Sequence, residues 1–395
     1  MQLKMKNFEY YNPVKIIFGR DTISKTSKLI PETARTLITY GGGSIKKNGV
    51  YDQVRNSLKN HTFFEFGGIE ANPDFHTLMK AVELVKKEKI DFLLSVGGGS
   101  VLDGTKFIAA AALYEGKDPW DLLTQKKTNK IGKTLPIGAI LTLPATGSEM
   151  NGFAVISRRE TKEKLTMGSP LLFPEFSILD PVTTLTLDKR QTTNGIVDAY
   201  VHILEQYITY DVNSPLQDRQ SEALLKTLVD ETPKLLKDPD NYDTRANIMW
   251  CATQALNGLV ACGVIQDWTT HMIGHEITAF YGLDHAQSLA VILPAVLKHQ
   301  KENKLQKFSQ YGRRVWHIVN KGEGRSADEL VYDIALEKTI SYFRQMDVKT
   351  KLSEYNITPE NFQEIASRFD ERKIKLGEHQ NITSKEVLEI LHLAL

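Results

Sequence analysis

Acidic and histidine side chains recur at helical spacing in the second half of the chain. Asp198 and His202 are four residues apart, so a helix would place them on one face, about one turn apart. His271 and His275 repeat this spacing, and His285 follows a Gly-Leu-Asp turn. One carboxylate with several imidazoles is a suitable ligand set for a divalent transition metal. The spacing therefore indicates a metal site with five candidate ligands and leaves open which of His271 and His275 binds.

The neighbours of Asp198 and His202 favour metal binding over more ordinary explanations. An Asp and a His at this spacing often form only a surface hydrogen bond, and a single His in an apolar helix usually belongs to the core. Here apolar side chains surround the pair: Ile196, Val197, Tyr200, Val201 and Ile203. A buried carboxylate requires a compensating charge, which a bound cation would supply.

Two glycine turns in the first half of the chain are suited to bind a phosphate group. Each follows an apolar strand and precedes a predicted helix: Gly41, Gly42, Gly43 and Ser44 form one, and Gly97, Gly98, Gly99 and Ser100 form the other. Glycines allow a ligand to approach the backbone closely, and the start of a helix offers free N–H groups to an anion. The alternative is a tight turn without a ligand. Because two such turns occur in one predicted sheet, we favour ligand binding.

Neither turn matches a complete nucleotide-binding fingerprint. The third small residue of the dinucleotide motif is missing, since Lys46 and Leu102 stand in its place, and no Gly-Lys-Ser/Thr of a P-loop follows. A third candidate for anion binding is the hydroxyl-rich segment 142–149 at the end of the strand 138–143, which contains Thr142, Thr146 and Ser148. Helix capping is the alternative there.

The elements that carry these residues divide the chain into two halves. Short β-rich runs alternate with amphipathic helices up to Asp180, at residues 15–19, 36–40, 63–66, 91–96, 138–143, 153–157 and 176–179. This alternation predicts a parallel sheet covered on both faces. Nearly every periodic segment after Pro181 is helical. We therefore predict two domains, an α/β domain over 1–184 and an all-helical domain over 185–395.

Composition excludes several other classes of protein. The 395 residues carry a net charge of +1, which argues against a nucleic-acid partner. The longest apolar runs are shorter than the roughly 18 residues that a membrane span requires. The N-terminal residues do not resemble a secretory signal, so we expect a cytoplasmic enzyme. The two cysteines, Cys251 and Cys262, suit neither a redox motif nor a zinc knuckle.

With these motifs the chain resembles the iron-dependent (group III) alcohol dehydrogenase family, and its NADPH-dependent aldehyde reductases and butanol dehydrogenases in particular. The resemblance extends over essentially the whole chain and rests on YGGGSIKKNG, FGGIEANP, SVGGGSVLDGTKFIA, TLPATGSEMN, NGIVDAYVHILEQY and HMIGHEITAFYGLDHAQSLA. It implies a dehydroquinate synthase-like fold, with a Rossmann-like α/β domain and a helical metal domain. It also implies a homodimer.

The resemblance implies a role for each candidate residue. The metal would be bound by Asp198, His202, His271 and His285, whereas His275 would be a histidine near the nicotinamide that does not bind the metal. The cofactor's pyrophosphate would lie at Gly97, Gly98, Gly99 and Ser100. Asp103 would be a catalytic neighbour of the nicotinamide or substrate, and further cofactor contacts would come from Thr142, Thr146, Ser148 and Lys164.

The first glycine turn indicates which nicotinamide cofactor is used. NAD-dependent members of the resembled family have an aspartate at the end of this turn, where it would repel a 2′-phosphate. Ser44 is neutral, and Lys46 and Lys47 follow closely. Glu65 lies at about the distance where a classical fold has its ribose-binding acid, but the classical fingerprint is incomplete. We therefore expect NADP(H).

These residues suggest metal-assisted hydride transfer between NADP(H) and a small alcohol or aldehyde, such as butanol or butyraldehyde. His275 is our candidate for the proton relay, since an imidazole titrates near neutral pH. Asp with three His suits Fe²⁺ or Zn²⁺, and also Ni²⁺ or Co²⁺. Two alternatives stay open: a lyase or polyol dehydrogenase of the same superfamily, and a metal hydrolase that needs no nicotinamide.

Overall fold

The computed structural model describes residues 4–124, 131–320 and 322–395, and they form two compact units. The first, here called the sheet unit, comprises Tyr11–Thr192 and Asp238–Asn257. The second, the helical unit, comprises Met1–Tyr10, Thr193–Lys237 and Gly258–Leu395. Our predicted boundary between residues 184 and 185 assigns Met1–Tyr10 to the first domain and Asp238–Asn257 to the second. This boundary stays a prediction.

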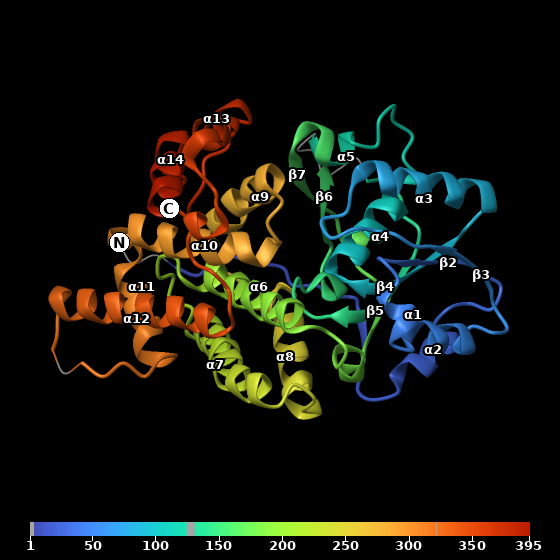
Figure 1. Ribbon diagram of the computed structural model, residues 1–395, viewed down its shortest axis with the longest axis horizontal. Helices are drawn as coiled ribbons and strands as arrows, with labels where there is room; N and C mark the ends of the chain where they lie inside the picture. Colours follow the sequence, from blue (N-terminus) through green and yellow to red (C-terminus); the bar gives the residue numbers. More distant parts are fainter. Residues whose placement is uncertain (1–3, 125–130, 321) are drawn as a thin grey trace. The chain divides into compact units, whose positions relative to one another are not determined.

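Six parallel strands form the central sheet of the sheet unit (Figure 1). Their order across the sheet is β1-β8-β5-β4-β2-β3, and every pairing is parallel. The bounds are β1 (Lys15–Phe18), β2 (Arg35–Tyr40), β3 (Thr62–Phe66), β4 (Phe92–Gly98), β5 (Ile137–Leu143) and β8 (Phe176–Leu179). The predicted parallel sheet is confirmed.

One predicted strand lies outside this sheet. The run at 153–157 becomes β6 (Phe153–Arg158), which pairs antiparallel with β7 (Glu163–Gly168) in a separate two-stranded ribbon. We did not predict β7, because its sequence EKLTMG begins with two charged residues and lacks the β-branched enrichment of a typical strand. The prediction was therefore right about the presence of a strand at 153–157 and wrong about its partner.

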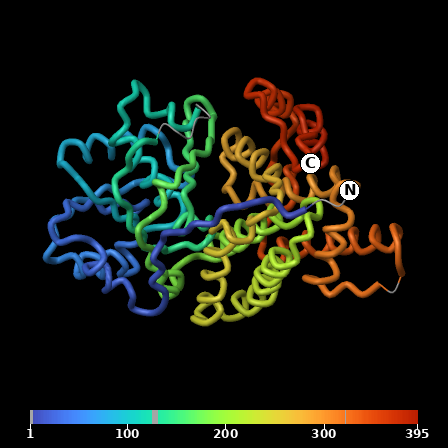
Figure 2. Tube along the Cα trace, turned by 180° about the vertical axis from the view of Figure 1, so that it is seen from behind, coloured from blue at the N-terminus to red at the C-terminus, as the bar shows by residue number. Residues whose placement is uncertain are grey.

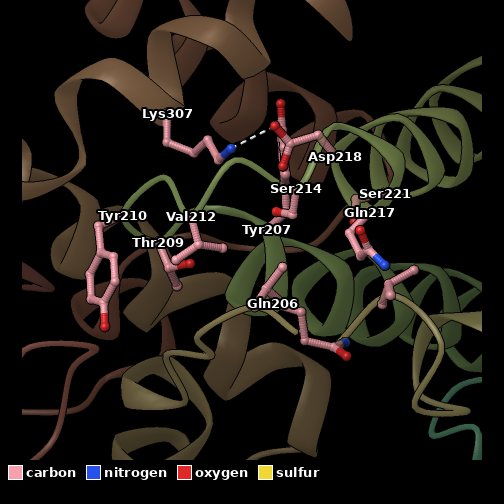
Figure 3. Close-up of a pocket in the computed structure, with 12 residues that line it drawn as sticks. Gln206, Tyr207, Thr209, Tyr210, Val212, Ser214, Gln217, Asp218, Ser221 and Lys307 are labelled. Atoms are coloured by element: carbon pink, nitrogen blue, oxygen red, sulfur yellow. Dashed lines mark hydrogen bonds and ion pairs between the residues drawn. The ribbon is translucent and has the colours of Figure 1, made fainter. Parts of the chain in front are cut away.

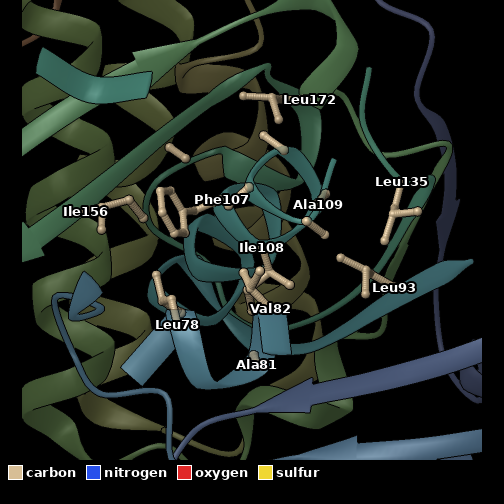
Figure 4. Packing of buried hydrophobic residues seen from close by; sticks show 14 of the residues in the cluster. Leu78, Ala81, Val82, Leu93, Phe107, Ile108, Ala109, Leu135, Ile156 and Leu172 are labelled. Atoms are coloured by element: carbon tan, nitrogen blue, oxygen red, sulfur yellow. The ribbon is translucent and has the colours of Figure 1, made fainter. Parts of the chain in front are cut away.

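Helices cover both faces of the sheet. Neighbouring residues of each strand point to opposite faces, so apolar side chains on both faces need a covering layer. Leu93 of β4 packs with α3 (Phe75–Glu88) and α4 (Gly99–Ala111), whose buried side chains are shown in Figure 4. The adjacent Leu94 packs on the other face, in a cluster to which these short helices contribute: η1 (Thr22–Lys28), α1 (Ser44–Lys47) and α2 (Val50–Ser57). The sheet unit also contains α5 (Asp121–Thr124), the further turns η3 (Ser148–Met150), η4 (Arg159–Thr161), η5 (Pro170–Leu172) and η6 (Pro181–Thr184), and α8 (Tyr242–Ala255).

The helical unit is built from long amphipathic helices. They are α6 (Lys189–Tyr207), α7 (Pro215–Lys237), α9 (Thr269–Tyr281), α10 (His285–His299), α11 (Lys301–Arg314), α12 (Arg325–Gln345), α13 (Phe362–Glu371) and α14 (Ser384–Leu393), with short turns η7 (Leu352–Tyr355) and η8 (Pro359–Asn361). Ile277 of α9 and Val291 of α10 share one core with residues of α13 and α14. The predicted helical second half is thereby confirmed.

The N-terminal segment belongs to the helical unit although it begins the chain. Lys6 N–H donates to the Gly263 carbonyl (2.9 Å), and Figure 2 shows this blue segment beside the helices. None of the helices in the described part of the chain is both long enough and apolar enough to span a membrane.

Candidate functional site

Two helices of the helical unit and the start of a third bring the predicted metal ligands together. α6 carries Asp198 and His202 one turn apart, α9 carries His271, and His285 is the first residue of α10. From Asp198 Oδ1, the distance is 3.5 Å to His202 Nδ1, and 3.7 Å to both His271 Nε2 and His285 Nε2. These distances are too long for hydrogen bonds. They are close to the roughly 3.4 Å edge of a tetrahedron with metal–ligand bonds of about 2.1 Å.

The chemistry of these atoms fits a cation. Asp198, His202 and His271 are buried, and one ligand atom from each lies within 4.8 Å of the others. His202 Nδ1 and His271 Nε2 are buried and make no hydrogen bond to the described residues. Leaving buried polar atoms without a partner is unfavourable, and a metal ion at this point would bind both nitrogens.

The two histidines differ in pKa, and both differences suit a positively charged ligand. Burial lowers the pKa of His202 to about 4, so its imidazole is neutral at pH 7, which is the form that binds a metal. Burial would also lower the pKa of His271, but the carboxylates of Glu205 and Asp198 outweigh it and raise this pKa to about 9. These carboxylates therefore favour a positive charge at the His271 ring. Either a bound proton or a bound divalent cation would supply that charge.

Glu205 holds His271 in place and was missed by our sequence analysis. One carboxylate oxygen contacts His271 Nδ1, and the other accepts from the backbone N–H of Thr270 (2.6 Å) and of His271 (3.4 Å). Such a carboxylate orients the imidazole so that its other nitrogen faces the metal. The signal was available, because residues 198, 202 and 205 lie on one helical face.

His275 lies one turn beyond His271 on α9 and outside the group formed by Asp198, His202 and His271. Its ring centroid is 5.1 Å from that of His285 and 6.3 Å from that of His271. The side chain is buried. The position of His275 agrees with a residue beside the metal that does not bind it, and this role stays a prediction.

The three predicted cofactor segments follow neighbouring strands of the sheet unit. The first glycine turn follows β2, the second lies at the junction of β4 and α4, and residues 144–148 follow β5. Because β2, β4 and β5 are adjacent and parallel, the three segments share the carboxyl edge of the sheet, where open α/β sheets bind their ligands.

The second glycine turn packs directly against the segment after β5. A Cβ atom at Gly99 would lie 2.4 Å from Thr146 Oγ1, and one at Gly97 would lie 2.5 Å from Val101 Cγ2. A larger residue at either position would therefore force the side chain of Thr146 or Val101 to move. Gly42 differs, because a Cβ there would have no atom of the described residues within 4 Å, apart from its own chain neighbours.

Two polar residues predicted to contact the cofactor are buried in hydrogen-bonded positions. The carboxylate of Asp103 accepts from the Ser148 hydroxyl (2.7 Å) and from Val155 N–H (2.9 Å). Lys164 Nζ on β7 donates to Asn72 Oδ1 (2.9 Å), and Asn72 N–H donates to the Ser100 hydroxyl (3.3 Å). Burial raises the pKa of Asp103.

The residues that indicated NADP(H) also lie at this edge of the sheet unit. Ser44 is exposed at the start of α1. Glu65, the competing ribose acid, accepts from Lys46 Nζ (3.3 Å), from the Tyr40 hydroxyl (3.3 Å) and from the Tyr51 hydroxyl. Glu65 is thus already bound by protein donors, which makes it a poorer acceptor for a ribose hydroxyl.

Comparison with known proteins shows the family. Residues 13–181 match the family described as iron-containing alcohol dehydrogenase, and residues 192–395 match the description Fe-containing alcohol dehydrogenase family, C-terminal. The chain is 52% identical over 381 residues to the NADPH-dependent aldehyde reductase YqhD of Escherichia coli. The matched region covers 96% of this chain and 97% of that protein.

Two further matches extend over nearly the same length. The chain is 41% identical over 394 residues to the probable NADH-dependent butanol dehydrogenase 1 of Bacillus subtilis, covering 99% of this chain and 100% of that protein. A crystal structure of Escherichia coli YqhD matches with a TM-score of 0.96 and 49% identity, over 100% of both chains. This chain belongs to the iron-containing alcohol dehydrogenase family and is an oxidoreductase of alcohols and aldehydes.

Proposed function

We propose that this enzyme reduces small aldehydes to alcohols with NADPH and that a divalent cation bound by Asp198, His202, His271 and His285 is required. The observation that supports the proposal most directly is the convergence of three imidazole nitrogens on one carboxylate oxygen at 3.5–3.7 Å. Family membership favours this reaction over the hydrolase and lyase alternatives.

The protein residues have separable tasks in this proposal. A cation bound here would supply Lewis-acid polarisation of the substrate carbonyl, and Fe²⁺ and Zn²⁺ are our candidates for it. Asp198 supplies negative charge, and His202 binds as a neutral imidazole. Glu205 fixes the ring of His271. His275 can donate a ring N–H proton as the carbonyl oxygen becomes a hydroxyl.

The sheet unit would bind the cofactor. NADP(H) supplies the hydride when bound, and the backbone of the two glycine turns would contact its phosphates. The relatives' names do not decide between the cofactors, since one is NADPH-dependent and another is named as NADH-dependent. The choice of NADPH rests on the neutral Ser44 and on the engagement of Glu65 by Lys46.

Anaerobic NADPH oxidation with butyraldehyde tests the proposal. Metal-stripped protein would be resupplied separately with Fe²⁺ and Zn²⁺, with NADH assayed in parallel. We expect turnover only after metal is restored, and mainly with NADPH. Turnover without metal would contradict the role of the Asp198 cluster, and dominant use of NADH would contradict the argument from Ser44. A homodimer and a cytoplasmic location stay predictions.

A further inference from the structure

A fully buried lysine lies next to the predicted cofactor segments and has no part in the mechanism above. Lys106 is on α4, and its side chain is 0% exposed. Five oxygens lie within hydrogen-bond distance of its ammonium, whose three N–H groups they share: Ser148 O (2.7 Å), Ser148 Oγ (2.8 Å), Asn151 O (2.8 Å), Asn151 Oδ1 (3.2 Å) and Phe153 O (2.8 Å). Three of these are backbone carbonyls, so the lysine fixes the path of the chain from residue 148 to 153.

These carbonyl groups converge because a positive charge lies between them. With an apolar side chain at position 106, these carbonyl oxygens would face one another in a buried position and lose the ammonium donor, which is unfavourable. The segment would then have to open towards water. Asn151 extends the same arrangement, because its Nδ2 donates to the Gly147 carbonyl (2.9 Å).

The segment held by Lys106 is also packed against the second glycine turn. α4 begins at Gly99, so one helix carries the turn at its first residue and Lys106 about two turns later. Asp103, one turn before Lys106, accepts from the Ser148 hydroxyl. The tight contact between Gly99 and Thr146 completes the connection. α4 therefore joins two of the three predicted cofactor segments to each other.

We propose that Lys106 is a positioning residue for the nucleotide: it holds residues 146–151 against the Gly97–Ser100 turn and thereby sets the affinity for NADP(H). This inference rests on the proposed function, since it assumes that these segments bind the cofactor.

A purely stabilising role explains Lys106 less well. Removing an ammonium group from water is costly, and apolar residues of similar volume often stabilise a fold as well as a buried charge does. The hydrogen-bond acceptors of Lys106 are neutral. Burial lowers the pKa of Lys106 to about 8, although the carboxylates of Asp103 and Glu149 act in the opposite direction. Fixing the carbonyls of a ligand-binding segment is a function that an apolar side chain could not perform.

The helical unit offers a matched control. Lys307 is also buried, and its Nζ donates to the buried carboxylate of Asp218 (2.6 Å), as Figure 3 shows. This lysine is on α11 and holds no predicted cofactor segment. Replacing either lysine by Met removes one buried ammonium and keeps a side chain of similar length. Both variants should therefore lose stability.

The test compares Lys106→Met and Lys307→Met with the wild-type enzyme by fluorescence titration with NADPH, thermal unfolding and metal analysis. We expect the Kd for NADPH to rise about tenfold or more in Lys106→Met. The reason is that residues 146–151 would move away from the glycine turn and lose their position against the nucleotide. KM for NADPH should rise while kcat at saturating NADPH changes less. Bound metal should be unchanged, and Lys307→Met should keep its Kd within about twofold.

Several results would overturn the inference. An unchanged Kd in folded Lys106→Met would show that the lysine is only structural, and an equal rise in Lys307→Met would show a general effect of lost stability. If wild-type protein does not bind NADPH, the proposed function itself fails and this inference fails with it.

A milder variant keeps the inference testable if Lys106→Met does not fold. Asn151→Ala removes one side-chain acceptor and the bond to the Gly147 carbonyl, and leaves Lys106 its four other oxygens. We expect the Kd for NADPH to rise about threefold or more, with bound metal unchanged. A folded Asn151→Ala protein with unchanged Kd would contradict the inference.

Discussion

The candidate metal site of the helical unit and the candidate nucleotide site of the sheet unit are built in opposite ways. In the candidate metal site, side chains would bind the ligand, and regular helices fix where these side chains point. In the candidate nucleotide site, the backbone of the glycine turns would face the ligand, and buried side chains fix the path of that backbone. A metal site of this kind is readable from spacing, whereas a backbone site depends on contacts between distant residues.

The buried lysines of the two units show the same contrast. Lys304 in the helical unit has carboxylate partners, Asp267 (2.8 Å) and Glu378 (3.0 Å), which raise its pKa although burial alone would lower it. Lys106 in the sheet unit has mostly carbonyl and hydroxyl partners, and burial lowers its pKa. Lys304 binds buried carboxylates directly, whereas Lys106 binds the neutral oxygens of one turn, and the carboxylates of Asp103 and Glu149 act on it without accepting its hydrogen bonds.

The largest effect should come from removing the carboxylate of the metal site. Asp198→Ala should lose its bound metal and about 1000-fold or more in aldehyde reduction, because Lewis-acid stabilisation is worth several kcal/mol. Metal analysis and a steady-state assay measure both.

In contrast, His275→Ala should lose activity and keep its metal. Loss of metal from His275→Ala would mean that the ligands are misassigned.

A smaller loss, about 100-fold in NADPH affinity, should follow when a methyl group is added where the glycine turn is packed against protein. Gly99→Ala would force Thr146 away from the turn, because its Cβ would lie 2.4 Å from Thr146 Oγ1. Gly42→Ala is the informative comparison, since its Cβ would contact nothing within 4 Å in the described part of the chain except its sequence neighbours. If a fully stable Gly42→Ala protein binds NADPH more weakly, the added methyl group must collide with the nucleotide. This result would show that the nucleotide lies against the Gly42 backbone. Normal affinity in Gly99→Ala would contradict the account of this turn.

Glu205→Gln should weaken metal binding by about 10- to 100-fold, because Gln has a single acceptor oxygen for the three N–H groups that Glu205 binds. Competition with a chromophoric chelator measures the affinity directly. The control is Glu276→Gln, which removes a buried carboxylate that binds Arg368 and Arg372 instead of a histidine. It should lower stability and leave metal affinity unchanged. Equal weakening in both variants would argue against a specific role of Glu205.

The smallest predicted effect concerns the choice of cofactor. Ser44→Asp should lower kcat/KM for NADPH about tenfold relative to NADH, because a carboxylate there would repel the 2′-phosphate. The neutral Ser44→Asn variant should change this ratio much less, which separates charge from size. The same ratio in the Asp variant and in wild-type protein would show that Ser44 does not face the 2′-phosphate.

The contrast between the sites also explains what the sequence could predict. Helical periodicity, which is visible in a single sequence, places Asp198 with His202 on one face of α6 and His271 with His275 on one face of α9. The packing that brings α6 to α9 is not visible in that periodicity. The parallel sheet followed from alternating strand and helix patterns. β7 was missed because its sequence begins with two charged residues, and the strand forms by pairing with β6 and by packing Met167 into the core. Lys106 was missed because an isolated lysine in an apolar helix usually extends to the surface, and its partners are 42 to 47 residues away.

The most direct test of the account measures bound metal and the Kd for NADPH on the same preparations of Asp198→Ala and Lys106→Met. The account predicts that Asp198→Ala loses the metal and binds NADPH within about twofold of wild type, and that Lys106→Met keeps the metal and binds NADPH at least about tenfold more weakly. If Asp198→Ala keeps its metal, or if either variant loses both ligands, the assignment of one site to each unit is contradicted.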